Sequence, residues 1–268
     1  MAKAAKLGQN FLRDRNIAAK IINEFLPQPG PVLEIGSGPG ILSELLLEKI
    51  PASLITLVEI DPLLAQGLRQ RFGSQLKIME RDILEIDLAQ MYPQGQVNII
   101  GNLPYHISKD LIDWFIAQRA RISEAVLMMQ KDFVDKLLSP AGGKKYNAQS
   151  VAFQLFFQAR RCFNVPAGAF SPAPKIISTV LVVHPAPAPL QAVSDEFYDF
   201  VKLCFAERRK TLWNNLAPHI EKNLLASMFD TCDLEQRVRA EQLPANSFYE
   251  LFLTANEPTA LDAEGKNI

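Results

Sequence analysis

The sequence is poor in cysteine and histidine, and it contains no long hydrophobic run. Its 268 residues include three cysteines that lie far apart, Cys162, Cys204 and Cys232. This spacing excludes a disulfide framework and a CxxC metal pair, and it is typical of a reducing cytoplasm. No apolar stretch approaches the roughly 20 residues of a membrane-spanning helix. Residues 1–9 also lack the apolar core of a secretory signal. We therefore expect a cytoplasmic protein that uses neither a metal nor a membrane.

The chain also lacks a strong net charge, because its formal charge at pH 7 is only −1. The charges are nevertheless unevenly distributed. Residues 1–183 carry 20 Lys and Arg against 16 Asp and Glu, whereas residues 184–268 carry 8 against 13. A nucleic-acid partner therefore cannot be inferred from the overall charge, and it has to be argued from local basic patches.

The composition predicts a large α/β domain followed by a small helical one. Hydrophobic residues make up 48% of the chain, which is enough for a sizeable core. A stiff proline-rich stretch, HPAPAP, begins at His184, and beyond it the hydrophobic pattern is helical throughout. We predict four segments in chain order: a basic arm at 1–15, an α/β domain at 16–184, a linker at 185–190 and a helical domain at 191–268.

A nucleoside-binding unit follows the first predicted strand. Residues 31–35 form a short buried strand that runs into the glycine-rich turn 36–40 and then into a helix. The next strand, 54–58, ends at Glu59, whose carboxylate can accept hydrogen bonds from both hydroxyls of a ribose. The dinucleotide fingerprint GxGxxG would require glycine where Ile41 stands, which argues against an NAD-dependent dehydrogenase.

Two further strand ends carry polar side chains. A strand at 76–79 precedes Asp82 and Ile83, which suit an adenine amino group and an adenine ring face, respectively. Taken alone, Asp82 is better explained as a surface residue in the loop after the strand than as a ligand-binding residue. A fourth strand, 97–100, precedes Asn102. Because the carboxyl ends of parallel strands meet at one edge of a sheet, these positions together predict a single ligand site.

The loop GNLPY at 101–105 has the chemistry to methylate an exocyclic amine on a nucleobase. The side-chain oxygen of Asn102 and the carbonyl of Pro104 can accept the two amine hydrogens and draw the nitrogen toward a nucleophilic geometry. Tyr105 offers an aromatic face to a base that has left its stack, and Pro104 stiffens the loop. An ordinary turn explains the same residues equally well when they are taken alone. Ser108 is predicted to cap the helix that follows.

Three other segments are candidates for contact with a nucleic acid. Phe170 begins a proline-stiffened loop between two predicted strands, where its ring could form a second wall for a base. Lys144 and Lys145 end a glycine-containing loop, and three consecutive cations occur at 208–210. The basic residues could equally be solvated surface charges, but we favour contact of the 208–210 cluster with phosphates.

Several motifs of the chain resemble the 16S ribosomal RNA adenine dimethyltransferases. The resemblance runs from about Gln9 to about Leu253. The motifs are QNFL at 9–12, EIGSGPG at 34–40, NLPYHIS at 102–108, QK at 130–131, FSPAPK at 170–175 and RRKTLWNNL at 208–216. The related macrolide-resistance 23S rRNA methyltransferases share the Asn-x-Pro-Tyr loop but lack the last two of these motifs.

The resemblance implies a Rossmann-like, seven-stranded class I methyltransferase sheet with a small C-terminal α-helical domain. It also implies S-adenosylmethionine as cofactor, and N6,N6-dimethylation of two adjacent adenosines in the 3′-terminal hairpin of 16S rRNA within an immature 30S subunit. We expect a monomer. With the residue patterns above, the candidate cofactor-binding residues are Asn10, Leu12, Gly36, Gly38, Glu59, Asp82, Ile83 and Asn102. The candidate catalytic residues are Asn102, Pro104, Tyr105 and Phe170, and the candidate RNA-binding residues are Lys144, Lys145, Arg208, Arg209 and Lys210.

Some positions differ from the family pattern, and other functions stay open. Ser37 and Ala167 stand where proline is usual, and Ile177 stands where aspartate is usual. None of these differences removes a proposed hydrogen-bond acceptor, so they bear on the RNA-facing surface more than on the chemistry. The alternatives are an RNA-binding assembly factor whose methyl transfer is dispensable, and an adenine-N6 methyltransferase that acts on 23S rRNA or DNA.

Overall fold

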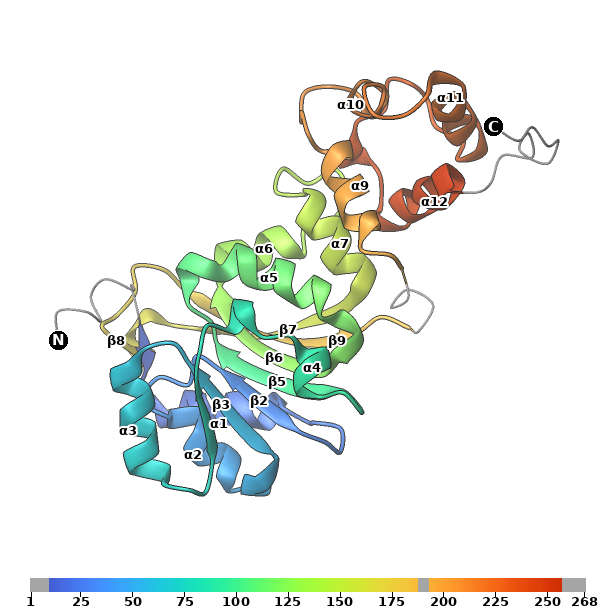
Figure 1. The fold of residues 1–268 in the computed structure, drawn as a ribbon. Coiled ribbons are helices and arrows are strands. Elements are labelled where there is room, and N and C mark those ends of the chain that lie inside the picture. The colour runs from blue at the N-terminus through green and yellow to red at the C-terminus, as the bar shows by residue number, and fades with distance from the viewer. Residues whose placement is uncertain (1–9, 188–192, 257–268) are drawn as a thin grey trace. The chain divides into compact units, whose positions relative to one another are not determined.

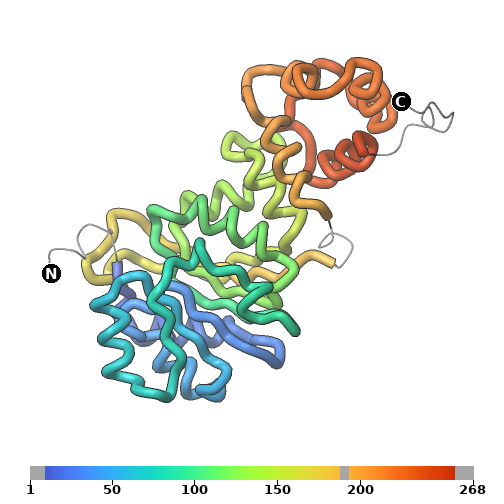
Figure 2. Tube along the Cα trace, viewed as in Figure 1, coloured from blue at the N-terminus to red at the C-terminus, as the bar shows by residue number. Residues whose placement is uncertain are grey.

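The structure is a computed structural model that describes residues 10–187 and 193–256. Contacts within the chain group these residues into two compact units. The first contains residues 10–137 and 156–187, and the second contains residues 138–155 and 193–256. Residues 138–155 therefore pack with the helical residues, although the sequence pattern assigns them to the α/β domain. The chain leaves the first unit after residue 137 and rejoins it at residue 156 (Figure 2).

The first unit is built on a mixed sheet of seven strands in the order β4-β3-β2-β5-β6-β9-β7. The five strands from β4 to β6 are parallel, and β9 runs antiparallel to both of its neighbours. This topology confirms the seven-stranded, Rossmann-like sheet that the family resemblance implies. The strand bounds are β2 (Val32–Ile35), β3 (Ile55–Glu59), β4 (Lys77–Glu80), β5 (Val97–Asn102), β6 (Ile122–Gln130), β7 (Phe157–Val165) and β9 (Ser178–Pro185).

Helices cover both faces of this sheet, which explains why its central strands are continuous apolar runs. All residues of β2 and β3 are buried, whereas the edge strand β4 is half-exposed. In Figure 1, α1, α2 and α3 lie on one side of the sheet, and α5 and α6 lie on the other. The helix bounds are α1 (Arg15–Glu24), α2 (Ile41–Leu47), α3 (Pro62–Phe72), α4 (Leu88–Met91), α5 (Ser108–Ala117) and α6 (Lys131–Leu137).

A short two-stranded ladder lies apart from the main sheet. The strand β1 (Phe11–Leu12) pairs antiparallel with β8 (Phe170–Ser171), so that Leu12 lies opposite Phe170. Both side chains are almost fully buried and belong to the core beneath α1 and α2. This ladder brings the start of the described chain next to a segment that lies about 160 residues further on.

The second unit is helical and is held together largely by aromatic rings. Phe197 packs edge-on against Phe252 with ring centres 5.5 Å apart, and Trp213 packs against Phe229 at 5.1 Å. The helix bounds are α7 (Ala148–Phe156, of which residues 148–155 belong to this unit), α9 (Glu196–Cys204), α10 (Leu212–Leu216), α11 (Lys222–Thr231) and α12 (Ala245–Asn256). Within the described ranges, no helix has the length and apolarity to cross a bilayer.

Candidate active site

A cavity of about 150 Å³ opens at the carboxyl edge of the parallel strands. It lies where the strand order reverses between β2 and β5, which is the position at which open α/β sheets bind their ligands. All four strand ends singled out by the sequence contribute to its wall. The lining residues are Asn10, Phe11, Ile35, Gly36, Gly38, Val58, Glu59, Ile60, Arg81, Asp82, Ile83, Asn102, Leu103, Pro104, Tyr105, His106 and Ile107.

The glycine-rich turn after β2 needs glycine for two separate reasons. Gly38 and Gly40 both adopt left-handed backbone conformations, with φ of 54° and 86°. In addition, a Cβ at Gly40 would lie 2.9 Å from the ring of Phe72, and a Cβ at Gly38 would lie 3.1 Å from the ring of Phe11. The turn is therefore closed tightly around its neighbours, and its backbone faces the cavity without side chains.

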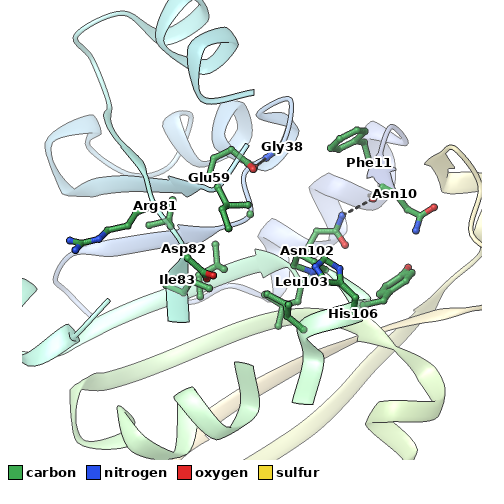
Figure 3. A pocket seen from close by; sticks show the side chains of 17 residues that line it. Asn10, Phe11, Gly38, Glu59, Arg81, Asp82, Ile83, Asn102, Leu103 and His106 are labelled. Carbon is green, nitrogen blue, oxygen red and sulfur yellow. Dashed lines mark hydrogen bonds between the residues drawn. The ribbon is translucent and has the colours of Figure 1, made fainter. Parts of the chain in front are cut away.

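The carboxylate of Glu59 is held in one orientation by backbone donors. Its Oε2 accepts a hydrogen bond from the Gly38 N–H at 2.8 Å (Figure 3). Its Oε1 accepts one from the Asp61 N–H at 2.9 Å. Only 3% of the residue is exposed. Burial raises the pKa of Glu59, while these two backbone hydrogen bonds oppose that increase. Because each carboxylate oxygen can accept a second hydrogen bond, Glu59 retains capacity for the hydroxyls of a ligand.

Asp82 and Ile83 both line the cavity. Asp82 Oδ1 accepts a hydrogen bond from the Leu84 N–H at 3.0 Å, which begins a single 3₁₀ turn over Ile83–Glu85. Its second carboxylate oxygen makes no such turn contact. Ile83 is buried, and its side chain lines the cavity beside Asp82 (Figure 3). The pair offers a hydrogen-bond acceptor next to an apolar surface.

The side-chain amide of Asn102 is also oriented by the backbone. Its Nδ2 donates to the carbonyl oxygen of Asn10 at 3.2 Å, so its Oδ1 is the atom left to accept a hydrogen bond (Figure 3). Pro104 and Tyr105 follow directly and line the same cavity. Ser108 does not cap α5, contrary to expectation: it is the first residue of that helix, and its hydroxyl donates to the Tyr105 carbonyl at 3.1 Å and the Pro104 carbonyl at 3.4 Å.

Two of the predicted catalytic and cofactor-binding residues lie outside the main cavity. Phe170 is 5% exposed, and its ring belongs to the core rather than to the cavity wall, because β8 pairs with β1. Leu12 is 3% exposed for the same reason. It lines only a smaller cavity of about 20 Å³ beneath the glycine turn, together with residues that include Glu34 and Ser37.

Sequence reasoning missed several residues that line the main cavity. Ile60 directly follows Glu59 and Arg81 directly precedes Asp82. Their position next to predicted acceptors was the one sequence signal that could have placed them at the cavity. His106 lies at the cavity as part of the reaction loop, although its position in the sequence indicates an ordinary loop histidine. Phe11 enters the site through β1, whose pairing no local pattern predicts.

Glu34 is a buried acid in β2, just before the glycine turn, and it is hydrogen-bonded to α2. It is 1% exposed, and its Oε2 accepts a hydrogen bond from the Ser43 hydroxyl at 2.6 Å. Burial raises the pKa of Glu34 to about 8, although the Ser43 hydrogen bond opposes the shift. Among the residues that the structure describes, no group of His, Cys, Asp and Glu side chains is arranged to hold a metal ion.

The five predicted RNA-binding residues all belong to the second unit, where Glu241 bonds to both of the loops that carry them. The Gly142 N–H donates to the Glu241 carbonyl at 2.6 Å, which holds the loop that carries Lys144 and Lys145. The side chain of Glu241 accepts a hydrogen bond from Arg208 Nε at 2.6 Å. Two loops that are about 60 residues apart in sequence are thus tied to one residue.

The cations of the 208–210 cluster differ in their pairing. Lys210 forms an ion pair with Glu207 at 2.6 Å, and Arg208 is paired with Glu241. Arg209 is exposed and forms no ion pair with any residue that the structure describes. Its charge is therefore the least neutralised of the three.

The fold and the cavity together define a class I methyltransferase. A mixed seven-stranded sheet carries a glycine turn after β2, an acid at the end of β3 and an Asn-Leu-Pro-Tyr loop after β5. Residues 2–257 match the family model described as ribosomal RNA adenine dimethylase. The chain belongs to this family.

Named relatives agree with this assignment over nearly the whole chain. The ribosomal RNA small subunit methyltransferase A of Prosthecochloris aestuarii is 38% identical, with 94% of each chain covered. The protein of that name from Streptococcus pneumoniae is 36% identical, with 91% of this chain and 89% of the relative covered. A dimethyladenosine transferase from Plasmodium falciparum is 26% identical, with a TM-score of 0.77 over 92% of this chain and 98% of the other. The 23S rRNA methyltransferase ErmE is 23% identical, and its TM-score of 0.69 over 92% of this chain and 100% of its own shows a shared fold.

Proposed function

We propose that this protein uses S-adenosylmethionine to dimethylate, at N6, two adjacent adenosines in the 3′-terminal hairpin of 16S rRNA within an immature 30S subunit. The observation that carries the proposal is that one cavity is lined by Glu59, Asp82 and Ile83 together with an oriented Asn102 amide. The names of the relatives, ribosomal RNA small subunit methyltransferase A and dimethyladenosine transferase, support the same reaction.

The residues of the cavity fit S-adenosylmethionine. The fixed carboxylate of Glu59 would hold the ribose hydroxyls, and Asp82 with Ile83 would hold the adenine amino group and ring. The turn that contains Gly36 and Gly38 allows a close approach of the cofactor to the backbone. When bound, the cofactor supplies a sulfonium methyl group, which is a strong electrophile and needs no metal for activation.

The loop after β5 would prepare the amine that receives the methyl group. The lone pair of an adenine amino group is delocalised into the ring, so the free amine is a poor nucleophile. Asn102 Oδ1 and the Pro104 carbonyl would accept its two hydrogens, and Tyr105 would stack on the base once it has left its helix. Asn102 is neutral, so the site binds an uncharged amine without burying an unpaired charge. Catalysis then rests on positioning, and we assign no general base.

The second unit would supply the contacts with the RNA backbone. Arg208, Arg209 and Lys210 are exposed, as are Lys144 and Lys145, and Glu241 ties both loops together. Lysine and arginine contacts with phosphates give affinity and register without reading sequence. We further propose that the protein acts as a cytoplasmic monomer.

The test is a methyl-transfer assay with labelled S-adenosylmethionine and small ribosomal subunits that lack the modification. The digested rRNA should contain dimethyladenosine at two adjacent positions. Subunits that already carry the modification, 23S rRNA and duplex DNA serve as controls and should remain unlabelled. Tight binding to subunits without transfer of label would overturn the proposal in favour of an assembly factor. Preferential labelling of 23S rRNA or DNA would overturn the proposed substrate.

A further inference from the structure

The hydroxyl of Tyr105 meets the hydroxyl of Ser178 at 2.6 Å, and the two residues are 73 positions apart in the sequence. Tyr105 lines the cavity in the reaction loop, whereas Ser178 begins β9 and is fully buried. This hydrogen bond therefore connects the tip of the proposed base-stacking ring to the interior of the sheet.

Ser178 is a rigid anchor, because β9 is paired on both of its edges. Its backbone lies opposite Gln130 of β6 on one side and Val165 of β7 on the other. The preceding carbonyl, that of Ile177, accepts a hydrogen bond from the Lys131 N–H at 2.9 Å. Three separate backbone attachments thus hold the main chain from which the Ser178 hydroxyl extends.

Tyr105, by contrast, belongs to a single 3₁₀ turn over Tyr105–Ile107 and is only half-buried. A tyrosine ring on such a turn can rotate about its side-chain bonds unless its far end is held. Burial raises the pKa of Tyr105, so its hydroxyl is protonated at neutral pH and can share a hydrogen bond with another hydroxyl. The hydrogen bond with Ser178 holds the ring at the end opposite its backbone.

We propose that Ser178 is a positioning residue, which fixes the Tyr105 ring so that its face is presented to the adenine that receives the methyl group. This inference rests on the proposed function and adds a residue that does not itself line the cavity. Ser178 acts only through Tyr105. Its loss should therefore lower turnover without weakening the binding of S-adenosylmethionine.

The first experiment compares Ser178→Ala, Tyr105→Phe and the double variant in the methyl-transfer assay. Both single changes remove the same hydrogen bond, while Tyr105→Phe keeps the aromatic face. We expect each to lower kcat about five- to twentyfold with little change in cofactor affinity. The double variant should lose no more than the worse single variant, because one interaction has been removed twice. Ser178→Thr keeps a hydroxyl and should restore kcat to within about threefold of the original.

Thr179→Val is the matched control on the same strand. Thr179 is also buried, and its Oγ1 donates to Asn164 Oδ1 at 2.8 Å, away from the reaction loop. This change should lower the melting temperature and leave kcat unaltered. If Ser178→Ala retains full kcat, if the two single losses add in the double variant, or if Ser178→Thr fails to restore activity, the inference is wrong.

A second measurement separates failure of this inference from failure of the proposed function. NMR spectra of protein with isotope-labelled tyrosine rings report the order of the Tyr105 ring without any substrate, and Tyr105→Phe assigns its signals. The ring should be ordered in the unmodified chain and mobile in Ser178→Ala. An unmodified chain that transfers no methyl group would refute the proposed function. An equally ordered ring in both proteins would refute the role of Ser178.

Discussion

Asn102 Nδ2 donates a hydrogen bond to the carbonyl oxygen of Asn10 at 3.2 Å, across 92 positions of sequence. A side-chain amide can be turned so that either its nitrogen or its oxygen faces a ligand. The Asn10 carbonyl settles this choice, because it can only accept a hydrogen bond. The segment that precedes β1 thereby sets the direction of the Asn102 oxygen, and the reaction loop depends on a residue far from it in the chain.

The first prediction concerns the amide oxygen of Asn102. Asn102→Ala should lower turnover at least tenfold, or about 1.4 kcal/mol or more in activation free energy, because one acceptor for the amine hydrogens is lost. Affinity for S-adenosylmethionine, measured by calorimetry, should change by less than about threefold. Asn102→Asp keeps an acceptor but cannot donate to Asn10, so it should also be impaired. Unchanged turnover in Asn102→Ala would remove the proposed mechanism.

The second prediction compares Gly40, which precedes α2 and packs against α3, with Gly67, which lies within α3. In Gly40→Ala, the new Cβ would lie 2.9 Å from the Phe72 ring and 3.0 Å from Leu68, at a φ of 86°. We expect a loss of about 1–3 kcal/mol in the free energy of unfolding. Gly67 is an exposed residue in the interior of α3, and a Cβ there meets nothing within 4 Å. Gly67→Ala should raise stability by about 0.5–1 kcal/mol. Urea unfolding measures both, and equal effects would contradict the geometry of the turn.

The third prediction concerns the pH dependence of stability that arises from Glu34. Its pKa is raised from 4.5 to about 8 in the folded chain, so between these values the folded state keeps a proton that the unfolded state releases. The free energy of unfolding should therefore fall as pH rises through this window, by up to about 1.4 kcal/mol per pH unit, and level off above it. Glu34→Gln removes the titrating group and should flatten this slope.

Urea unfolding at several pH values between 5 and 9 tests this expectation. Glu48→Gln is the control, because Glu48 is an exposed glutamate whose ion pair with Arg15 is long, at 3.5 Å. That variant should keep the slope of the unmodified chain. If Glu34→Gln and the unmodified chain give parallel curves, Glu34 is not the group responsible.

The fourth prediction concerns Arg209, the one cation of the 208–210 cluster that forms no ion pair with a described residue. Arg209→Ala should weaken binding to the small subunit and reduce the slope of log affinity against log salt concentration by about one. Arg237→Ala is the control, because Arg237 is an exposed arginine of the same unit that pairs with Glu235. A salt slope that is unaffected by Arg209→Ala would exclude a phosphate contact there.

Local patterns in the sequence predicted the parallel strands whose ends line the cavity, whereas the seven-stranded sheet was expected from the family resemblance. Apolar runs of four to six residues, each followed by glycine, acid or asparagine, identified the parallel strands and the order of the groups at their ends. Such signals suffice because a strand buried on both faces must be apolar. The carboxyl ends of parallel strands then necessarily meet, and for this reason the cavity forms where the sequence placed a ligand.

Other features depended on contacts between residues that are far apart in the chain. The sequence suggested the Phe170 ring as a second wall for a base, but the ring is buried in the core because β8 pairs with β1. Residues 138–155 join the second unit because Tyr146 packs on Phe205 and Gly142 bonds to Glu241. Local sequence contains no signal for such pairings, since their partners are chosen by packing across the fold.

The sequence alone therefore identified the candidate reactive groups, but it did not determine how their side chains are oriented. The amino-acid order places Glu59, Asp82 and Asn102 at successive strand ends, and a parallel sheet has to bring them together. The orientation of the Asn102 amide depends on its hydrogen bond with Asn10. The orientation of the Tyr105 ring depends on its hydrogen bond with Ser178, and both partners come from distant parts of the chain. Hydrogen bonds of this kind form only after the surrounding elements have packed, so the tertiary structure alone decides them.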